Sequence, residues 1–180
     1  MTLATGTVTT VIFPEKKGPA TEDVPVGTPM DQYWSIAHTD DERHTLMAEI
    51  RQRLSGDGRT HALVYSWDRP CRSGAHFERD EATGFGMWLQ DDDDEFPREH
   101  LTAAVDHGYG ALVFHNGRAQ CVSLNPRPIA PEVVIPFDFG VTHEFPAASV
   151  LPLDRVFAVI EEYILTGQRP SGVEWTRVTG

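Results

Sequence analysis

Apolar side chains recur every three or four residues through positions 153–165, which is the pattern of a helix with one buried face. They are Leu153, Val156, Phe157, Ile160, Tyr163 and Ile164. Pro152 suits the first helical position, Gly167 suits a left-handed residue just past the end, and Pro170 prevents continuation. The pattern predicts a helix of about four turns. Alternating apolar and polar side chains then predict a half-buried strand over residues 172–178.

Near the start of the chain, a β-branched run at residues 7–13 and the segment 33–36 predict two strands. Between them, residues 14–31 are rich in proline and glycine, which is typical of a loop or mobile arm. Thr39 and Glu42 have the spacing of a capping box, so a helix is expected to begin there. Its apolar stripe consists of Leu46, Met47, Ile50 and Leu54.

Gly56 lies close to where this helix is expected to be capped, and residues 61–67 follow as a central or near-central strand. This strand carries Leu63, Tyr65 and Trp67 on one face. A second alternating segment covers residues 85–89, just before the acidic run at residues 91–95. We expect that run to be solvated.

Three short apolar runs, at residues 101–105, 111–115 and 119–124, predict an antiparallel meander. Residues 107–110 and the Asn116-Gly117 pair separate them, and Asn-Gly is the strongest short-range hairpin signal. The run at 101–105 is also compatible with a helix, because Ala and Leu favour helices.

Residues 133–141 carry apolar side chains at every odd position, so they predict a strand with one buried face. Pro136 cannot donate to a ladder and favours a sheet edge or a bulge. Strands clustered between two helices indicate an α+β fold, with a mainly antiparallel twisted sheet of about six to seven strands and two principal helices packed on it. We expect residues 1–31 to form an N-terminal strand and arm, and residues 32–180 to form a single domain.

The net charge of -12 disfavours direct contact with nucleic acid or anionic lipid, and it favours encounters with a basic macromolecule. A chain of 180 residues buries about 70% of its unfolded surface without a metal or disulfide staple. Neither Cys71 nor Cys121 belongs to a Cys-x-x-Cys pair. Neither a signal-peptide pattern nor a bilayer-spanning apolar run is evident, so we expect a cytoplasmic protein without membrane contact.

The eight histidines do not form a recognisable metal or catalytic motif. We expect His100, His107 and His115 to be surface or turn residues. The acidic run lacks the alternating ligands and central glycine of a calcium loop. Nucleophile-elbow, phosphate-loop and dinucleotide-binding motifs are also missing from the sequence. We therefore predict no catalytic, cofactor-binding or metal-binding residues.

The C-terminal stretch carries a more specific pattern. It combines Glu144-Phe145-Pro146, Pro152 with its helix, Gly167, Arg169-Pro170 and Trp175. Together these residues resemble the C-terminal signature of the first immunity-protein family of bacterial polymorphic toxin systems. The strand and arm before Tyr33 are additional to the family pattern. The resemblance implies a small α+β protein that binds and neutralises a cognate toxin, commonly a nucleic-acid deaminase such as a cytosine deaminase.

For such a protein we expect a toxin with a basic surface, which an acidic inhibitor would occlude. The signature residues Glu144, Phe145, Pro146, Pro152, Gly167, Arg169, Pro170 and Trp175 are expected to be structural. The toxin-contacting candidates are Trp88, Asp91, Asp92, Asp93, Asp94 and Glu95, because charge beside an aromatic anchor is typical of specific interfaces. Two alternatives remain: a small enzyme that uses scattered His, Asp and Glu residues, and a general acidic protein-interaction module.

Overall fold

The computed structural model describes ten stretches of the chain: residues 8–15, 31–37, 39–56, 60–67, 77–79, 86–88, 99–116, 119–128, 135–137 and 143–178. The two helices are α1 (Asp40–Leu54) and α2 (Leu153–Thr166). The longer strands are β1 (Val8–Glu15), β2 (Asp31–Ala37), β3 (Thr60–Trp67), β6 (Glu99–Asp106), β7 (Tyr109–Asn116), β8 (Gln120–Leu124) and β12 (Glu174–Arg177). The short elements are β4 (Phe77–Arg79), β5 (Gly86–Trp88), β9 (Pro136–Phe137), β10 (His143–Glu144), the 3-10 turn η2 (Ala147–Ser149) and β11 (Leu151–Pro152).

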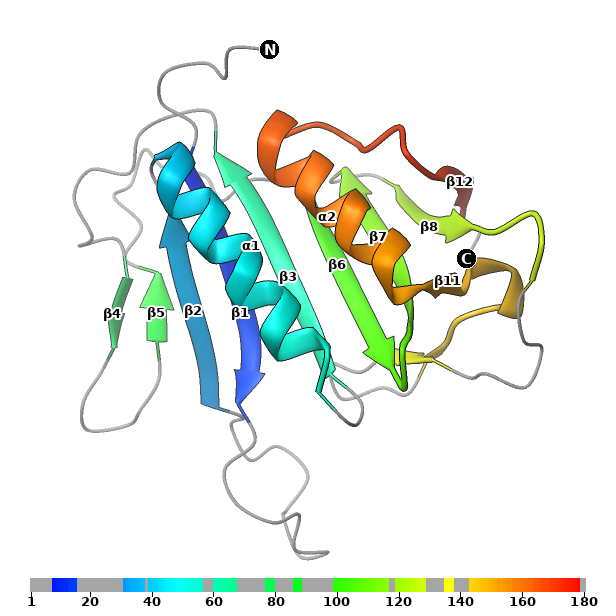
Figure 1. Ribbon diagram of the computed structural model, residues 1–180, viewed down its shortest axis with the longest axis horizontal. Coiled ribbons are helices and arrows are strands. Elements are labelled where there is room, and N and C mark those ends of the chain that lie inside the picture. Colours follow the sequence, from blue (N-terminus) through cyan, green and yellow to red (C-terminus); the bar gives the residue numbers. More distant parts are fainter. Residues whose placement is uncertain are drawn as a thin grey trace, which may run out of the picture.

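The main sheet has the strand order β12-β8-β7-β6-β3-β1-β2, and the short β11 pairs with β7. All of these pairings are antiparallel. Both helices lie on the same face of the sheet (Figure 1). This arrangement confirms the α+β prediction of an antiparallel sheet with two principal helices.

Helix α1 begins where the sequence predicts. The Thr39 side chain accepts a hydrogen bond from the backbone N–H of Glu42, and the Glu42 side chain accepts one from the N–H of Thr39, so the capping box is complete. The predicted stripe of Leu46, Met47, Ile50 and Leu54 is buried. The C-cap is Ser55 in a right-handed conformation, so Gly56 follows the cap.

Helix α2 buries its predicted apolar face and is 14 residues long. Pro152 is the N-cap, one position before the first helical residue that we predicted for it. Gly167 is the C-cap at φ +65°, and its N–H donates to Tyr163 O at 2.8 Å. The left-handed stop was predicted correctly.

The meander of β6, β7 and β8 is confirmed, and residues 101–105 belong to a strand rather than a helix. His107 and Gly108 form the two-residue turn between β6 and β7, with φ values of +46° and +82°. Asn116 lies at the end of β7, and its N–H donates to Ala119 O at 3.2 Å. The predicted Asn-Gly turn includes Gly117, which lies outside the described residues.

Two apolar layers cover the sheet. The larger one lies between the sheet and the helices and includes Val11 and Phe13 of β1, Leu101 of β6 and Leu112 of β7. The smaller one lies on the opposite face of β6, β7 and β8, where the segment with Ile135, Phe145 and Val150 packs. Side chains therefore alternate between two buried faces along the central strands.

In β3 the helices cover the face opposite to the one that carries Leu63 and Tyr65. The helix-covered face carries Ala62 and Val64, both 0% exposed. Leu63 and Tyr65 point to the opposite face because successive side chains of a strand alternate, and the side chain of Trp67 lies outside the described residues. The position of β3 between β6 and β1 confirms that the strand is central.

The strands predicted at residues 7–13, 33–36 and 172–178 appear as β1, β2 and β12. Of the strand predicted at 133–141, Ile135 and β9 are described, and β9 pairs with β10 in a separate small sheet. β5, inside the segment 85–89, pairs with β4 in another. The loop predicted at residues 14–31 is too long at both ends, because residues 14 and 15 belong to β1 and residue 31 begins β2. Residues 16–30 lie outside the described residues. The boundary at residue 31 stays a prediction, and β1 lies between β2 and β3.

Candidate functional site

The predicted contact residues lie mostly outside the described part of the chain. This holds for Asp91, Asp92, Asp93, Asp94 and Glu95. Trp88 ends β5, where it is the register partner of Phe77, and its side chain is outside the description. The role of these six residues as toxin contacts stays a prediction. The candidate surfaces within the described residues are formed by other side chains.

The first part of the signature lies at the smaller apolar layer. Glu144 in β10 pairs with Pro136, and Phe145 donates its N–H to Ile135 O at 3.1 Å. Phe145 is buried beside Ile135, and Pro146 is the N-cap of η2. The segment thus attaches to the sheet face that the helices do not cover.

Buried hydrogen bonds fix the chain between η2 and α2. Ser123 of β8 accepts the N–H of Leu112 at 3.1 Å, and its hydroxyl donates to Ser149 O at 2.7 Å. Asn125 donates from Nδ2 to Val150 O at 2.9 Å. These contacts position Pro152, an exposed residue at the start of α2.

The connection from α2 to β12 is held by side chains of the helix. The Glu162 carboxylate accepts the N–H and the hydroxyl of Ser171 at 2.7 and 2.8 Å, and the N–H of Gly172 at 2.9 Å. Burial opposes ionisation of this carboxyl, but the hydrogen bonds from Ser171 and Gly172 outweigh it and lower the pKa of Glu162 below its ordinary value. Arg155 donates to Gly172 O at 2.5 Å.

The last signature residues complete this connection. Trp175 donates from its indole nitrogen to Pro170 O at 2.7 Å, and its ring centre lies 6.1 Å from that of Phe114 in β7. Pro170 is buried, whereas Arg169 is exposed. A Cβ on Gly167 would lie 2.9 Å from Ser66 Oγ, so this left-handed position is also tightly packed against β3.

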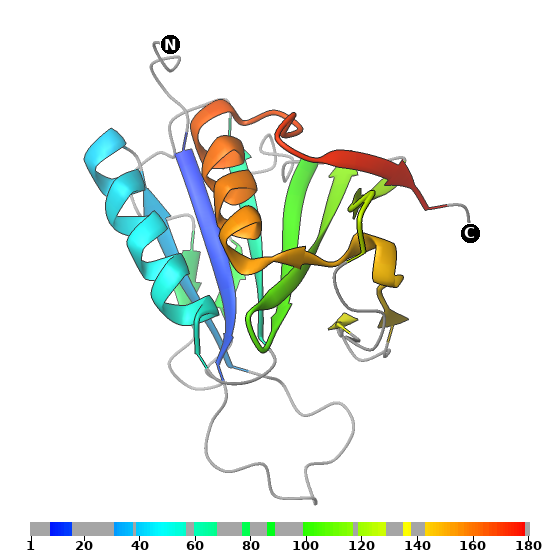
Figure 2. The same cartoon turned by 45° about the vertical axis from the view of Figure 1, so that its right-hand side comes forward.

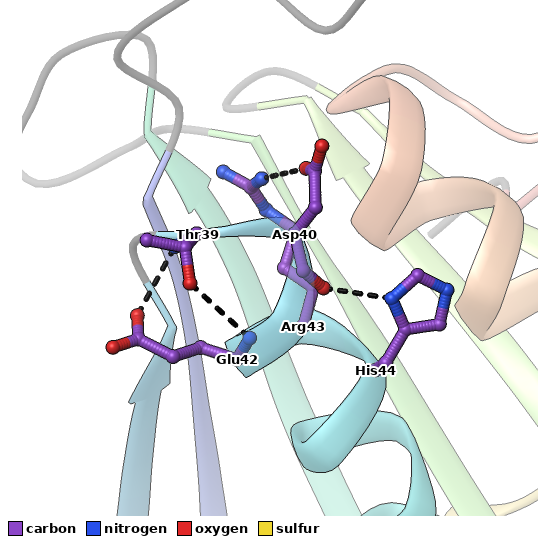
Figure 3. A network of polar contacts seen from close by, with 5 residues as sticks. All are labelled: Thr39, Asp40, Glu42, Arg43 and His44. Carbon is purple, nitrogen blue, oxygen red and sulfur yellow. Dashed lines mark hydrogen bonds and ion pairs between the residues drawn. The ribbon is translucent and has the colours of Figure 1, made fainter.

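The first turn of α1 carries three acidic residues, Asp40, Asp41 and Glu42, and Figure 3 shows two of them, Asp40 and Glu42, with their polar contacts. Arg43 is 5% exposed and donates to Asp40 Oδ1 at 2.7 Å, while the Asp40 side chain is 67% exposed. His44 Nδ1 lies 2.8 Å from Asp40 O. Acidic side chains stabilise a helix N-terminus, so this cluster has a structural role in addition to its negative charge.

An exposed ion pair joins the two helices. Arg51 and Glu161 approach to 3.2 Å, with both side chains 45% exposed, and the Arg51 guanidinium lies 4.9 Å from the centre of the Phe157 ring. Exposed pairs of this kind contribute little to stability. At this contact the helix layer therefore exposes charges of both signs.

The histidine expectation is wrong for two residues. His100 and His115 are direct cross-strand partners on β6 and β7, and their rings stack with centres 4.1 Å apart. Tyr65 stacks on His100 at 5.0 Å. Burial, and then the nearby His115, lower the pKa of His100 to about 4, and burial lowers the pKa of His115. His107 is a turn residue, as expected, with its Nδ1 2.5 Å from Asp106 Oδ1.

The pairing of His100 with His115 follows from the position of the turn between β6 and β7. A two-residue turn at His107 and Gly108 pairs Asp106 with Tyr109, and counting back along both strands places residue 100 opposite residue 115. Within the described residues, no group of three or more His, Cys, Asp or Glu side chains is arranged to hold a metal ion. The stacked histidines alone do not form a metal site.

The family model described as Immunity protein Imm1 matches residues 22–177, which is most of the chain. The matched segment begins after β1 and includes every later element. No curated protein matches the chain. Among the described residues, no helix combines the length and hydrophobicity that crossing a bilayer requires.

Proposed function

The chain belongs to the Imm1 family of immunity proteins, and from this premise we propose that it binds a cytosine deaminase toxin and occludes the active or nucleic-acid-binding surface of that toxin. An immunity protein acts against a toxin, so the toxin is the partner that the family assigns. The proposal adds the class of toxin, the mode of inhibition and a cytoplasmic place of action. Neither a cofactor nor chemistry of its own is needed for this function.

The observation that carries the proposal is the charge of the chain. Acidic residues outnumber Lys and Arg by 27 to 15. A toxin that acts on nucleic acid needs a basic substrate-binding surface, because phosphate contacts dominate its affinity for substrate. A strongly acidic partner is attracted to that same surface and competes with the substrate there.

The contacts of the signature residues support a division of roles. The side chains of Phe145 and Trp175 pack or hydrogen-bond within the protein. Pro170 is buried and its carbonyl accepts the Trp175 hydrogen bond, and Gly167 ends a helix against β3. Recognition is therefore assigned to other groups. We retain Trp88 and the acidic run at residues 91–95 as the proposed side-chain contacts, and the exposed acids of the first turn of α1 add to the same field.

Co-expression with a cognate cytosine deaminase toxin tests the proposal. We expect the protein to restore growth, to co-purify with the toxin, and to suppress conversion of cytosine to uracil in DNA or RNA. A toxin that binds but has a different activity would remove the deaminase assignment and leave the family assignment intact. Growth arrest without a complex would contradict inhibition by binding.

The enzyme alternative makes a different prediction about stoichiometry. A binding inhibitor protects in proportion to the amount of complex formed, whereas an enzyme that modifies the toxin acts at a small fraction of one equivalent. Among the described residues, His100 and His115 lie together, but their rings stack on each other across β6 and β7. We therefore favour the binding function.

A further inference from the structure

The main sheet ends at β12. This strand pairs with β8, and within the described stretches β8 is its one strand partner. Figure 2 shows β12 in red at the end of the sheet, running toward the C-terminus. An edge strand presents unpaired backbone groups, to which another extended chain can add.

The register shows which groups face outward. Val178 donates its N–H to Gln120 O at 2.9 Å, so this residue faces β8 with its backbone groups. In an antiparallel ladder the hydrogen-bonded residues alternate, which assigns Glu174 and Thr176 to the β8 side. The N–H and C=O groups of Trp175 and Arg177 therefore point away from β8, two residues apart, in the arrangement that a new strand requires.

The strand is already fixed in the shape that it would need for pairing. The Trp175 indole is bonded to Pro170 O, and its ring packs against the main core. Glu162 and Arg155 hold the residues immediately before the strand. Because these contacts order the edge in advance, an incoming strand would not have to compensate for ordering β12.

A toxin segment suits this edge better than a second copy of the chain. Two copies of the chain each have a net charge of -12, so self-pairing at this edge brings like charges together. The large apolar side chains that stand exposed among the described residues are Leu165 and Val178, so apolar burial beside the edge would be small. A basic toxin brings complementary charge to a chain of net charge -12.

We propose that β12 receives an extended segment of the cognate toxin, which adds to the main sheet through the outward N–H and C=O groups of Trp175 and Arg177. The inference rests on the proposed function, because it takes the toxin as the partner. The Trp175 side chain keeps its internal role while the backbone of the same residue contacts the toxin. A basic side chain of the added strand beside Glu174 would favour one register.

Substitution at residue 177 tests this contact. Arg177→Pro removes an N–H that does not bond to β8, and proline is tolerated on edge strands. Arg177→Ala removes the same charge and keeps the N–H. We expect the proline variant to bind the toxin at least tenfold more weakly than the alanine variant. Equal affinities in two variants that both unfold cooperatively would overturn the proposal.

Amide hydrogen exchange gives a second test that needs no substitution. In the complex of the unmodified protein with its toxin, we expect the amides of Trp175 and Arg177 to become protected at least tenfold. The Thr176 amide, already directed at β8, should change much less. Unchanged exchange at residues 175 and 177 in a fully formed complex would contradict strand addition.

The outcomes separate this inference from the proposed function. If the toxin binds and is inhibited, but the residue 177 variants and the exchange rates show no effect, the assignment of β12 as a toxin contact is wrong and the proposed function stands. If the unmodified protein does not bind the toxin, both fail. A dimer of the protein alone that protects the same two amides would identify a second copy as the occupant and overturn the proposal.

Discussion

Gly167 illustrates how a single residue connects the signature to the fold. It has φ +65°, and an added Cβ would lie 2.9 Å from Ser66 Oγ. Both features oppose any other residue at the C-terminus of α2. Gly108 has φ +82° but open space around the position of a Cβ. A substitution at Gly108 therefore introduces backbone strain alone, whereas one at Gly167 introduces backbone strain and a steric contact.

We expect Gly108→Ala to lower the free energy of unfolding by about 1 kcal/mol through its left-handed backbone. Gly167→Ala should lower it by about 2 kcal/mol or more, because the contact with Ser66 adds to the same strain. Urea unfolding of the two variants measures the difference. Equal losses of unfolding free energy in the two variants would show that the Ser66 side chain moves aside without a measurable loss of stability.

The stacked histidines make stability depend on pH. Both pKa values lie below the ordinary value of about 6.5, with that of His100 at about 4. The unfolded chain therefore binds more protons than the folded protein below about pH 6.5. Stability conferred by the neutral pair is present above this pH and is lost progressively as the pH falls toward 4.

His100→Phe should keep a ring in the stack and reduce the loss of stability between pH 7 and pH 5. Denaturant midpoints at the two pH values give the measurement. Tyr65→Phe is the matched control, because it changes the ring that stacks on His100 and leaves both imidazoles in place. An unaltered pH dependence in the His100 variant would show that other groups control it.

At the level of elements, the sequence predicts the features that depend on residues close together in the chain. The capping box of Thr39 and Glu42 and the glycine stop at Gly167 identify the helix ends, because each acts within a few residues. The position of β1 depends instead on pairing with distant segments. The stacking of His100 and His115 likewise depends on register, which the turn at His107 and Gly108 controls.

Strand β1 lies before the segment that matches the family, yet it separates β2 from β3 and buries Val11 and Phe13 in the main core. Deleting residues 1–21 should abolish cooperative unfolding, because β2 and β3 both lose their ladders with β1. Deleting residues 1–7 leaves β1 complete and serves as the control. Circular dichroism and thermal melts distinguish the two, and a cooperative melt after the longer deletion would show that β1 is dispensable.

At the level of the whole molecule, the net charge can be predicted from the sequence directly, whereas the surface that contacts the toxin cannot. The net charge of -12 follows from counting residues. Specific contacts depend on complementary details of a partner surface that the chain does not encode. The assignment of Trp88 and residues 91–95 therefore stays a prediction, whereas the fold and the family are established.

If the acidic run steers the encounter, Asp92→Asn with Asp93→Asn should slow association with the toxin and flatten its dependence on ionic strength. The physical reason is that screening acts over a Debye length of about 8 Å at physiological salt. Stopped-flow mixing at several salt concentrations measures both quantities. Asp154→Asn with Glu161→Gln, two exposed acids of α2, is the control with the same change in net charge, and an equal effect there would assign steering to overall charge.

The central claim is inhibition by stoichiometric binding, and an activity titration tests it most directly. Purified toxin at a fixed concentration well above the dissociation constant is mixed with increasing amounts of this protein, and deamination of a nucleic-acid substrate is followed. We predict a linear fall to complete inhibition at one equivalent, independent of incubation time. Full activity beyond one equivalent, or time-dependent inactivation at a small fraction of one equivalent, would contradict it.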